Sequence, residues 1–273
     1  MTLLAVAVSG RGLVDPAEPV LRADDEALLR GRAAFETVRV YAGRPFRLGA
    51  HLERLDGSAR AIGLPPVRRD EIEALARQAL DAAASPEAVL RLYWTPGETA
   101  LALVSEVPGS IEELRARGQR LVTLLGVRAE VPWLLPGVKS TSYAVNMAAD
   151  AEAKRRGADD AVFVDRDGIV LEGPTTNVWW RRGNTLHTPS LELGILAGVT
   201  RAAILELAPA AGYELAEGVY PLADLAGVEE AFTSSSVREL VPIVELDGKP
   251  VGDGRPGEAA RTLQAALRRA AGG

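Results

Sequence analysis

The fold of this 273-residue chain is decided by residues 138–178, which open with VKSTSY (138–143) and close with VLEGPTTNV (170–178). The hydroxyl residues at 140–142 are N-cap candidates, and the alanine-rich segment that follows, residues 144–156, predicts a helix. Gly157 then stands where helices commonly end in the left-handed conformation. The first half of the stretch is therefore expected to be a loop followed by a helix.

The second half has the pattern of a β-hairpin. AVFV at residues 161–164 predicts a strand, DRDG at residues 165–168 is typical turn chemistry, and residues 169–171 predict the returning strand. Lys139 then lies just before a helix and Glu172 at the end of a strand. An amine and a carboxylate placed at element ends can face one another across a cleft.

Taken singly, Lys139 and Glu172 would be surface groups, but the whole segment resembles the signature of the class IV (fold type IV) pyridoxal-phosphate aminotransferases. In that family a lysine forms the Schiff base, and a glutamate followed by an asparagine marks the partner of the cofactor's ring nitrogen. The resemblance implies that Lys139 is the catalytic lysine and that Glu172 and Asn177 bind the cofactor. It also implies that Tyr143 hydrogen-bonds the cofactor's phenolic oxygen.

An earlier segment is similar to the N-terminal signature of the same family. FETVR at residues 35–39 predicts a strand, a hairpin follows, and HLERL at residues 51–55 begins a helix. Without the resemblance, Arg54 would be an exposed helix arginine paired with a neighbour. With it, Arg54 is the phosphate-binding arginine, a role that suits a planar fork able to hold two phosphate oxygens. Phe35 and Arg39 become candidates for substrate contact.

GILAGVTR at residues 194–201 leads into a helix predicted over residues 202–211. A glycine loop that enters a helix N-terminus presents free N–H groups to a phosphate, and Thr200 can cap the helix. A plain capped helix is the alternative interpretation. The resemblance favours phosphate contacts from Val199 and Thr200.

FTSSS at residues 232–236 ends another predicted strand. The family places small hydroxyl residues at this point, near the phosphate and the substrate carboxylate, which implies cofactor contacts from Ser235 and Ser236. A solvated serine loop is the alternative interpretation.

Two further residues are candidates for substrate contact. Arg91 aligns with a substrate-side arginine of branched-chain enzymes, or else serves a purely structural purpose in its strand. Trp133 lies in an irregular connection, where it lines a substrate pocket or acts as a packing anchor. Residues 91–97 lack the Arg-x-His pattern of typical D-amino-acid transaminases, so their carboxylate-binding arrangement is not expected here.

The expected architecture is a mixed α/β fold of two domains. The sequence places a smaller N-terminal domain at residues 1–127, a connection at residues 128–137 and a larger cofactor-binding domain at residues 138–273. The resemblance implies that the cofactor lies in the cleft between the domains. It also implies a homodimer whose partner loops complete each site.

Composition narrows the function further. A net charge of −6 argues against nucleic-acid or anionic-membrane partners, and two histidines without any cysteine leave little from which to build a metal site. The absence of cysteine also fits a reducing cytoplasm, and the start of the chain predicts a first strand and not a signal peptide.

The favoured function is transfer of an amino group from an amino acid or amine to a 2-keto acid. The alternative is 4-amino-4-deoxychorismate lyase, because that family member shares the same motifs and eliminates pyruvate. A relative that binds pyridoxal phosphate or another phosphate ligand without turnover is a third interpretation, against which the joint presence of Lys139, Glu172 and Arg54 argues.

Overall fold

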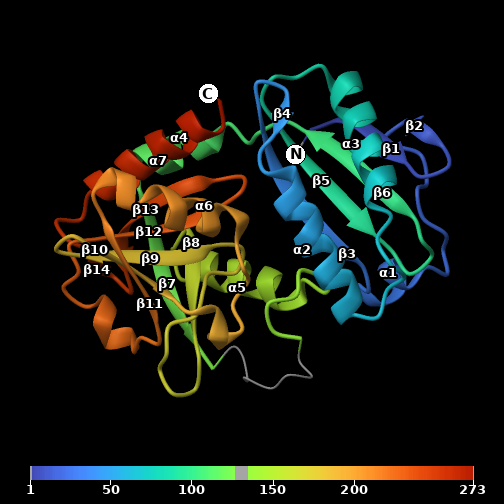
Figure 1. Ribbon diagram of the computed structural model, residues 1–273. Coiled ribbons are helices and arrows are strands. Elements are labelled where there is room, and N and C mark those ends of the chain that lie inside the picture. Colours follow the sequence, from blue (N-terminus) through green and yellow to red (C-terminus); the bar gives the residue numbers. More distant parts are fainter. Residues whose placement is uncertain (1, 127–134, 273) are drawn as a thin grey trace. The chain divides into compact units, whose positions relative to one another are not determined.

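The computed structural model describes residues 2–126 and 135–272, which form two compact units (Figure 1). The first unit comprises Met1–Pro108, Val138–Tyr143 and Ala271–Gly273. The second comprises Gly109–Gly137 and Ala144–Ala270. Each unit is built on a sheet of its own.

The sheet of the first unit is antiparallel and, within the described residues, has six strands in the order β2-β1-β6-β5-β3-β4. Two helices, α2 and α3, contact its strands (Figure 1). The elements of this unit are β1 (Leu3–Val8), β2 (Gly12–Val14), α1 (Glu26–Arg30), β3 (Ala34–Tyr41), β4 (Arg44–Pro45), α2 (Leu48–Ala61), α3 (Arg69–Ala83), β5 (Ala88–Trp94) and β6 (Ala100–Ser105).

The core of the first unit lies between this sheet and its helices. Successive strand side chains point to opposite faces, and Ala34, Val38 and Val40 on β3 belong to the core that includes Leu52 and Leu55 of α2. Burying a leucine side chain contributes roughly 1.5–3 kcal/mol. Because the alternation also puts residue 36 on this face, β3 carries a glutamate into an otherwise apolar row.

The second unit has a mixed sheet that, counted over the described residues, contains eight strands. Their order is β11-β10-β9-β12-β13-β7-β8, with β14 paired to β13. The elements are α4 (Ser110–Arg117), β7 (Gln119–Leu125), α5 (Ala144–Arg155), β8 (Asp160–Val164), β9 (Asn177–Arg182), β10 (Thr185–Pro189), α6 (Val199–Leu207), β11 (Glu214–Gly218), β12 (Glu230–Ser235), β13 (Glu239–Leu246), β14 (Lys249–Pro250), α7 (Glu258–Ala270) and the 3-10 helices η2 (Leu191–Leu193), η3 (Pro209–Ala211) and η4 (Leu222–Leu225).

Apart from the last residues, Ala271–Gly273, the units differ from the predicted domains in two places. Strand β7 lies in the second sheet, between β13 and β8, because both of these strands pair with it in parallel. The segment Val138–Tyr143 belongs to the first unit, since residues 139–141 hydrogen-bond to residues 33–35. The predicted boundary had placed β7 before the connection and Lys139 after it.

Local predictions differ from the structure at two elements. The helix predicted over residues 202–211 begins at Val199 and ends at Leu207, because Pro209 has no N–H to continue the ladder. Of residues 169–171, only Ile169 and Val170 make isolated bridges, and none belongs to a strand. Their backbone hydrogen bonds are divided, because the N–H of Val170 donates to Tyr220 and that of Leu171 donates to Phe163.

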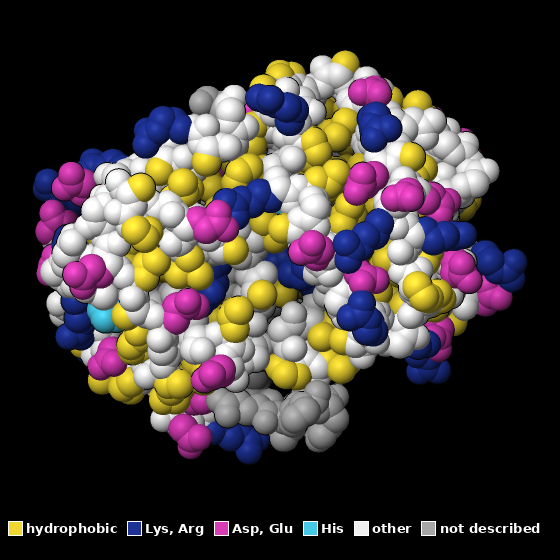
Figure 2. Space-filling model, viewed as in Figure 1, with side chains coloured by type: hydrophobic (Ala, Val, Ile, Leu, Met, Phe, Trp, Pro, Cys, Tyr) yellow, Lys and Arg dark blue, Asp and Glu magenta, His cyan; other side chains and the backbone are white. Residues whose placement is uncertain are grey.

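In the described part of the chain, no helix has the length and apolar character needed to cross a membrane. On the face shown in Figure 2, basic and acidic side chains are interspersed. A surface of mixed sign has no strong attraction for a polyanion.

Candidate active site

The segment that carries Lys139 lies along the edge of β3. The N–H of Phe35 donates to the carbonyl of Lys139 at 3.2 Å, and the N–H of Thr141 donates to the carbonyl of Ala33 at 2.9 Å. The backbone N–H of Lys139 donates to Ser58 Oγ on α2 at 3.1 Å. The lysine backbone is therefore held from two sides, by a strand and by a helix.

Hydroxyl groups beside the lysine bind the chain near Gly31. Thr141 Oγ1 donates to the carbonyl of Gly31 at 2.7 Å, and Ser142 Oγ donates to the same oxygen at 3.0 Å. Gly31 has φ +64°, and a Cβ there would lie 3.1 Å from the Cα of Ser142. These hydroxyls, predicted as N-cap candidates for the following helix, hold the Lys139 segment against the first unit.

The Lys139 side chain lies over an aromatic ring. Its Nζ is 4.3 Å from the centre of the Phe35 ring, a distance at which a cation is attracted to the ring face. Phe35 in turn stacks on Tyr93, with ring centres 5.8 Å apart, and meets Tyr143 edge to face at 5.5 Å. The structure thus brings together three predicted residues, Lys139, Phe35 and Tyr143, and adds Tyr93, which the sequence did not indicate.

Arg54 binds a buried carboxylate. Its Nε and Nη2 donate to the two oxygens of Glu36, each at 2.7 Å, and Nδ1 of His51 lies 2.7 Å from Glu36 Oε2. Burial opposes ionisation of Glu36, but the hydrogen bonds from Arg54 and His51 outweigh it and lower its pKa to about 2. Burial lowers the pKa of His51, and the nearby charges of Arg54 and Lys139 contribute in the same direction. His51 is consequently neutral near pH 7.

Two predicted substrate residues, Arg39 and Arg91, lie on the same face of the first sheet as Phe35, by the alternation of β3 and the β3–β5 register. Arg39 pairs with Glu87 and lies over the Tyr41 ring, while its Nε and Nη1 are buried without a partner among the described residues. Arg91 Nη1 donates to Ser105 Oγ at 3.0 Å. Trp133 lies outside the described residues.

In the second unit, Glu172 and Asn177 form a buried polar pair. Glu172 is 4% exposed and Asn177 is 5% exposed. Glu172 Oε2 accepts hydrogen bonds from the N–H of Leu196 at 3.0 Å and from Asn177 Nδ2 at 3.5 Å, and Asn177 Nδ2 also donates to the carbonyl of Leu196 at 2.9 Å. The two residues are thus joined through the loop that precedes α6.

That loop enters α6 through Gly198. A Cβ at Gly198 would lie 2.1 Å from Asn177 Oδ1, so only glycine fits beside the asparagine. Val199 and Thr200 occupy the first two positions of α6 and are buried. The N-cap is Gly198 and not Thr200 as predicted, because the helix begins earlier than its sequence pattern indicated. First-turn N–H groups have no intrahelical partner and suit an anion.

Ser235 ends β12, and Ser236 begins the turn toward β13. The N–H of Arg238 donates to Ser235 Oγ at 3.3 Å. Both serines are half-buried, so their hydroxyls lie near the surface at a strand end.

Comparison with known proteins decides the family. The profile described as "Amino-transferase class IV" matches residues 33–246. The chain belongs to the class IV aminotransferases. A bifunctional aminodeoxychorismate lyase / D-amino acid transaminase of Mycobacterium tuberculosis is 38% identical over 259 residues, covering 87% of this chain and 89% of the relative. An aminodeoxychorismate lyase of Bacillus subtilis is 33% identical, covering 94% and 91%.

Solved structures agree with this class IV assignment. A hypothetical aminotransferase from Mycobacterium tuberculosis in its PLP-bound form superposes with a TM-score of 0.90 at 33% identity, covering 97% of this chain and 98% of that one. Its form with alpha-ketoglutarate and PMP gives a TM-score of 0.91. This class IV chain is therefore an enzyme that depends on pyridoxal phosphate, and its mixed α/β fold is that of the fold type IV transaminases.

The residues of this class IV enzyme fit the cofactor. A buried carboxylate held by two donors suits a protonated ring nitrogen. The first-turn N–H groups of α6, which begins directly after Gly198, have no intrahelical partner and suit a phosphate. Sequence reasoning missed Glu36 and His51 although both lie in quoted motifs. Two sequence signals could have indicated these residues. Glu36 is a charged residue in the apolar row of β3, and His51 lies three residues before Arg54 on the core side of α2.

Proposed function

We propose that this enzyme transfers an amino group from an amino acid or amine to a 2-keto acid and that Lys139 is its cofactor-bearing lysine. The observation that carries the proposal is the placement of Lys139. Its backbone is fixed by Phe35 and Ser58 while its amine reaches the Phe35 ring. When bound, pyridoxal phosphate supplies the electron sink for the electrons released at the substrate Cα.

The chain's own residues divide the remaining tasks. Lys139 moves the proton at the substrate Cα, a step for which its amine must be neutral. Glu172, anchored through Leu196 and Asn177, is the anion for the ring nitrogen. Tyr143 is assigned to the cofactor's phenolic oxygen.

The phosphate is assigned to several donors, since an anion of this charge is best held by charge-assisted hydrogen bonds. They are Arg54, the first-turn positions Val199 and Thr200, and the hydroxyls of Ser235 and Ser236. Phe35, Arg39, Arg91 and Trp133 are assigned to the substrate. Arg39 is supported by two buried nitrogens that have no partner in the described part of the chain and would suit a carboxylate.

Aminodeoxychorismate lyase is the second candidate function. It is favoured by the likeness to a Bacillus subtilis lyase and to a bifunctional Mycobacterium tuberculosis enzyme. Lyase chemistry begins with the same proton removal by Lys139, so the same residues serve both reactions.

The deciding experiment supplies the enzyme with single amino donors and no keto acid. The donors are both enantiomers of alanine and glutamate, branched-chain amino acids and a chiral arylamine. A transaminase converts its cofactor to the pyridoxamine form with the correct donor, which names the donor and its handedness together. If no donor changes the spectrum while aminodeoxychorismate yields 4-aminobenzoate and pyruvate, the lyase assignment replaces the transaminase one.

We further infer that the enzyme is a cytoplasmic homodimer. The support is the resemblance to dimeric class IV enzymes and the absence of cysteine from the sequence. Light scattering coupled to gel filtration tests the dimer: a mass equal to one chain would overturn it.

A further inference from the structure

Glu239 has a backbone conformation that glutamate seldom adopts. It has φ +56° and its side chain is 1% exposed. It pairs with Ser235 across the β12–β13 hairpin, at a point where left-handed residues are usually glycine or asparagine. A strained, buried and charged residue at the end of a turn calls for an explanation beyond the turn itself.

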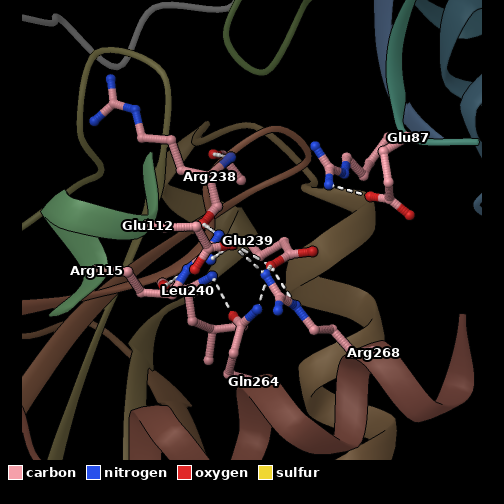
Figure 3. A network of polar contacts seen from close by, with 10 residues as sticks. Glu87, Glu112, Arg115, Arg238, Glu239, Leu240, Gln264 and Arg268 are labelled. Atoms are coloured by element: carbon pink, nitrogen blue, oxygen red, sulfur yellow. Dashed lines mark hydrogen bonds and ion pairs between the residues drawn. The ribbon is translucent and has the colours of Figure 1, made fainter. Parts of the chain in front are cut away.

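Three side chains converge on the Glu239 carboxylate, as Figure 3 shows. Arg115 Nη2 lies 3.0 Å from Glu239 Oε2 and Arg268 Nη2 lies 3.1 Å from it, while Gln264 Nε2 donates to the same oxygen. Glu112 joins both arginines, at 2.7 Å from each. We call Glu112, Arg115, Glu239, Gln264 and Arg268 the Glu239 network; it joins α4 and α7 to the hairpin.

The Glu239 network also holds the backbone on either side of Glu239. Arg115 Nη2 donates to the carbonyl of Arg238 at 2.9 Å, and Arg115 Nε donates to that of Leu240 at 3.2 Å. The N–H of Leu240 donates to Gln264 Oε1 at 3.1 Å. Three consecutive residues are thereby fixed by two helices.

The Arg238 side chain is not part of the Glu239 network, and Figure 3 shows its guanidinium pointing away from that network. Its Nη1 pairs with the buried Asp160 at 2.6 Å, and its Nη2 donates to Thr175 Oγ1 at 3.4 Å. Its N–H donates to Ser235 Oγ. Arg238 thus connects the serine turn to the loop between Glu172 and Asn177.

A contribution to stability alone does not account for the choice of glutamate. Glycine would relieve the left-handed φ, and replacement of buried ion pairs by apolar packing is often neutral or stabilising. A buried ionic network is better suited to fixing one conformation of the residues that it holds. Here those residues adjoin Ser235 and Ser236.

We propose that Glu239 is a positioning residue for cofactor binding: through the Glu239 network it holds the turn after β12 so that Ser235 and Ser236 face the cofactor phosphate. This inference rests on the assignment of the two serines under the proposed function. It predicts an effect on affinity for the phosphate group and little effect on the proton transfer made by Lys139.

The test uses full-length apoenzyme titrated with pyridoxal phosphate and, separately, with pyridoxal. Glu239→Ala should weaken pyridoxal phosphate binding about tenfold or more, the range typical of losing a support behind a ligand. Pyridoxal binding and kcat at saturating cofactor should stay within about threefold. Glu239→Gln, which keeps the shape and one oxygen acceptor, should recover part of the affinity. Glu239→Gly, with the φ strain removed, should bind as weakly as Glu239→Ala.

Glu230→Ala is the matched control. Glu230 is 3% exposed, lies at the other end of β12 and accepts hydrogen bonds from Ala259 and Ala260 in α7 at 2.9 and 2.7 Å. Its loss should lower the thermal midpoint about as much as Glu239→Ala and leave cofactor affinity unchanged.

Two results would overturn the inference, and they are distinguishable. If Ser235→Ala and Ser236→Ala weaken pyridoxal phosphate binding but Glu239→Ala behaves like Glu230→Ala, the network is purely structural and the phosphate site stands. If the serine variants bind the cofactor like the wild type, the assignment of the serines fails and the inference fails with it.

Discussion

Arg54 and Glu36 form a bidentate ion pair, with Arg54 Nε and Nη2 each 2.7 Å from a different carboxylate oxygen. Such a pair fixes the plane of the guanidinium as well as its position. Because Glu36 is fully buried and also contacts His51, the direction in which Arg54 presents its donors is determined inside the first unit.

The Glu36 ion pair predicts a specific dependence of stability on pH. The pKa of Glu36 is about 2, below its ordinary value of 4.5, so its contribution is complete above pH 4.5 and is lost as the pH falls toward 2. Glu36→Gln should reduce the free energy of unfolding at pH 7 by about 3 kcal/mol. Urea titrations at several pH values measure this difference, which should shrink steadily below pH 4.5. Glu53→Gln, on the exposed side of α2, is the control, and a difference that is independent of pH would contradict the prediction.

Lys139 can be tested by labelling with few ambiguities, because the sequence contains only three lysines, Lys139, Lys154 and Lys249. Borohydride reduction of the yellow holoenzyme should place the cofactor on the peptide with Lys139. Lys139→Ala should lower turnover by about 10²–10⁴, whereas Lys154→Arg and Lys249→Arg should be as active as the wild type. Cofactor recovered on either of the other two lysines would remove Lys139 from its role.

We expect substitutions of Glu172 and Asn177 to have different effects, one on the rate of the half-reaction and the other on its pH dependence. Glu172→Gln keeps the shape but removes the anion, so the half-reaction rate should fall far more than the cofactor affinity. Asn177→Asp places a second carboxylate about where Asn177 Nδ2 now lies, 3.5 Å from Glu172 Oε2. A neighbouring like charge raises a carboxyl pKa, so the acidic limb of the rate profile should move to higher pH. Stopped-flow half-reactions across pH 5–9, a range set about neutrality, measure both. An unchanged half-reaction in Glu172→Gln would show that another group serves the ring.

We expect Gly198→Ala to impair the enzyme for a purely steric reason. Gly198 has φ −66° and ψ 130°, which any residue adopts, but its Cβ would lie 2.1 Å from Asn177 Oδ1. Displacing Asn177 removes its hydrogen bond to Glu172, and the half-reaction should slow about tenfold, as expected for one hydrogen bond to a charged group. Gly109→Ala is the matched control, since Gly109 also precedes a helix with negative φ and has open space around its Cβ. Equal effects of the two substitutions would point to the helix start and not to Asn177.

The sequence predicted the elements around the site better than the contacts between them. The helix after Tyr143, the left-handed Gly157 and the strand at residues 160–164 were all recognisable because they follow from local propensity and periodicity. Arg54 was recognised through a motif, whereas its partner Glu36 depends on the register of a strand against a helix. Pairings between distant segments are set by packing, which a local pattern does not encode.

Tertiary contacts at two places are not encoded in the local pattern. Thr141 and Ser142 carry N-cap chemistry, and their hydroxyls also donate to Gly31, more than a hundred residues earlier in the sequence. Thr200 has the right side chain to cap α6, but the helix begins at Val199 and its N-cap is Gly198, which lies against Asn177.

The hydrogen bonds that attach residues 139–142 to Gly31 and Ala33 have a consequence for biosynthesis. The first unit is discontinuous in the sequence, so its first 108 residues leave the ribosome before the segment that covers the edge of β3. Until residue 143 has emerged, that edge has open backbone donors near Ala33 and Phe35, which are a template for pairing with another chain. The lysine assigned to catalysis thus arrives on the segment that closes the unit, and no cofactor site with Lys139 in place exists on a nascent chain before that closure.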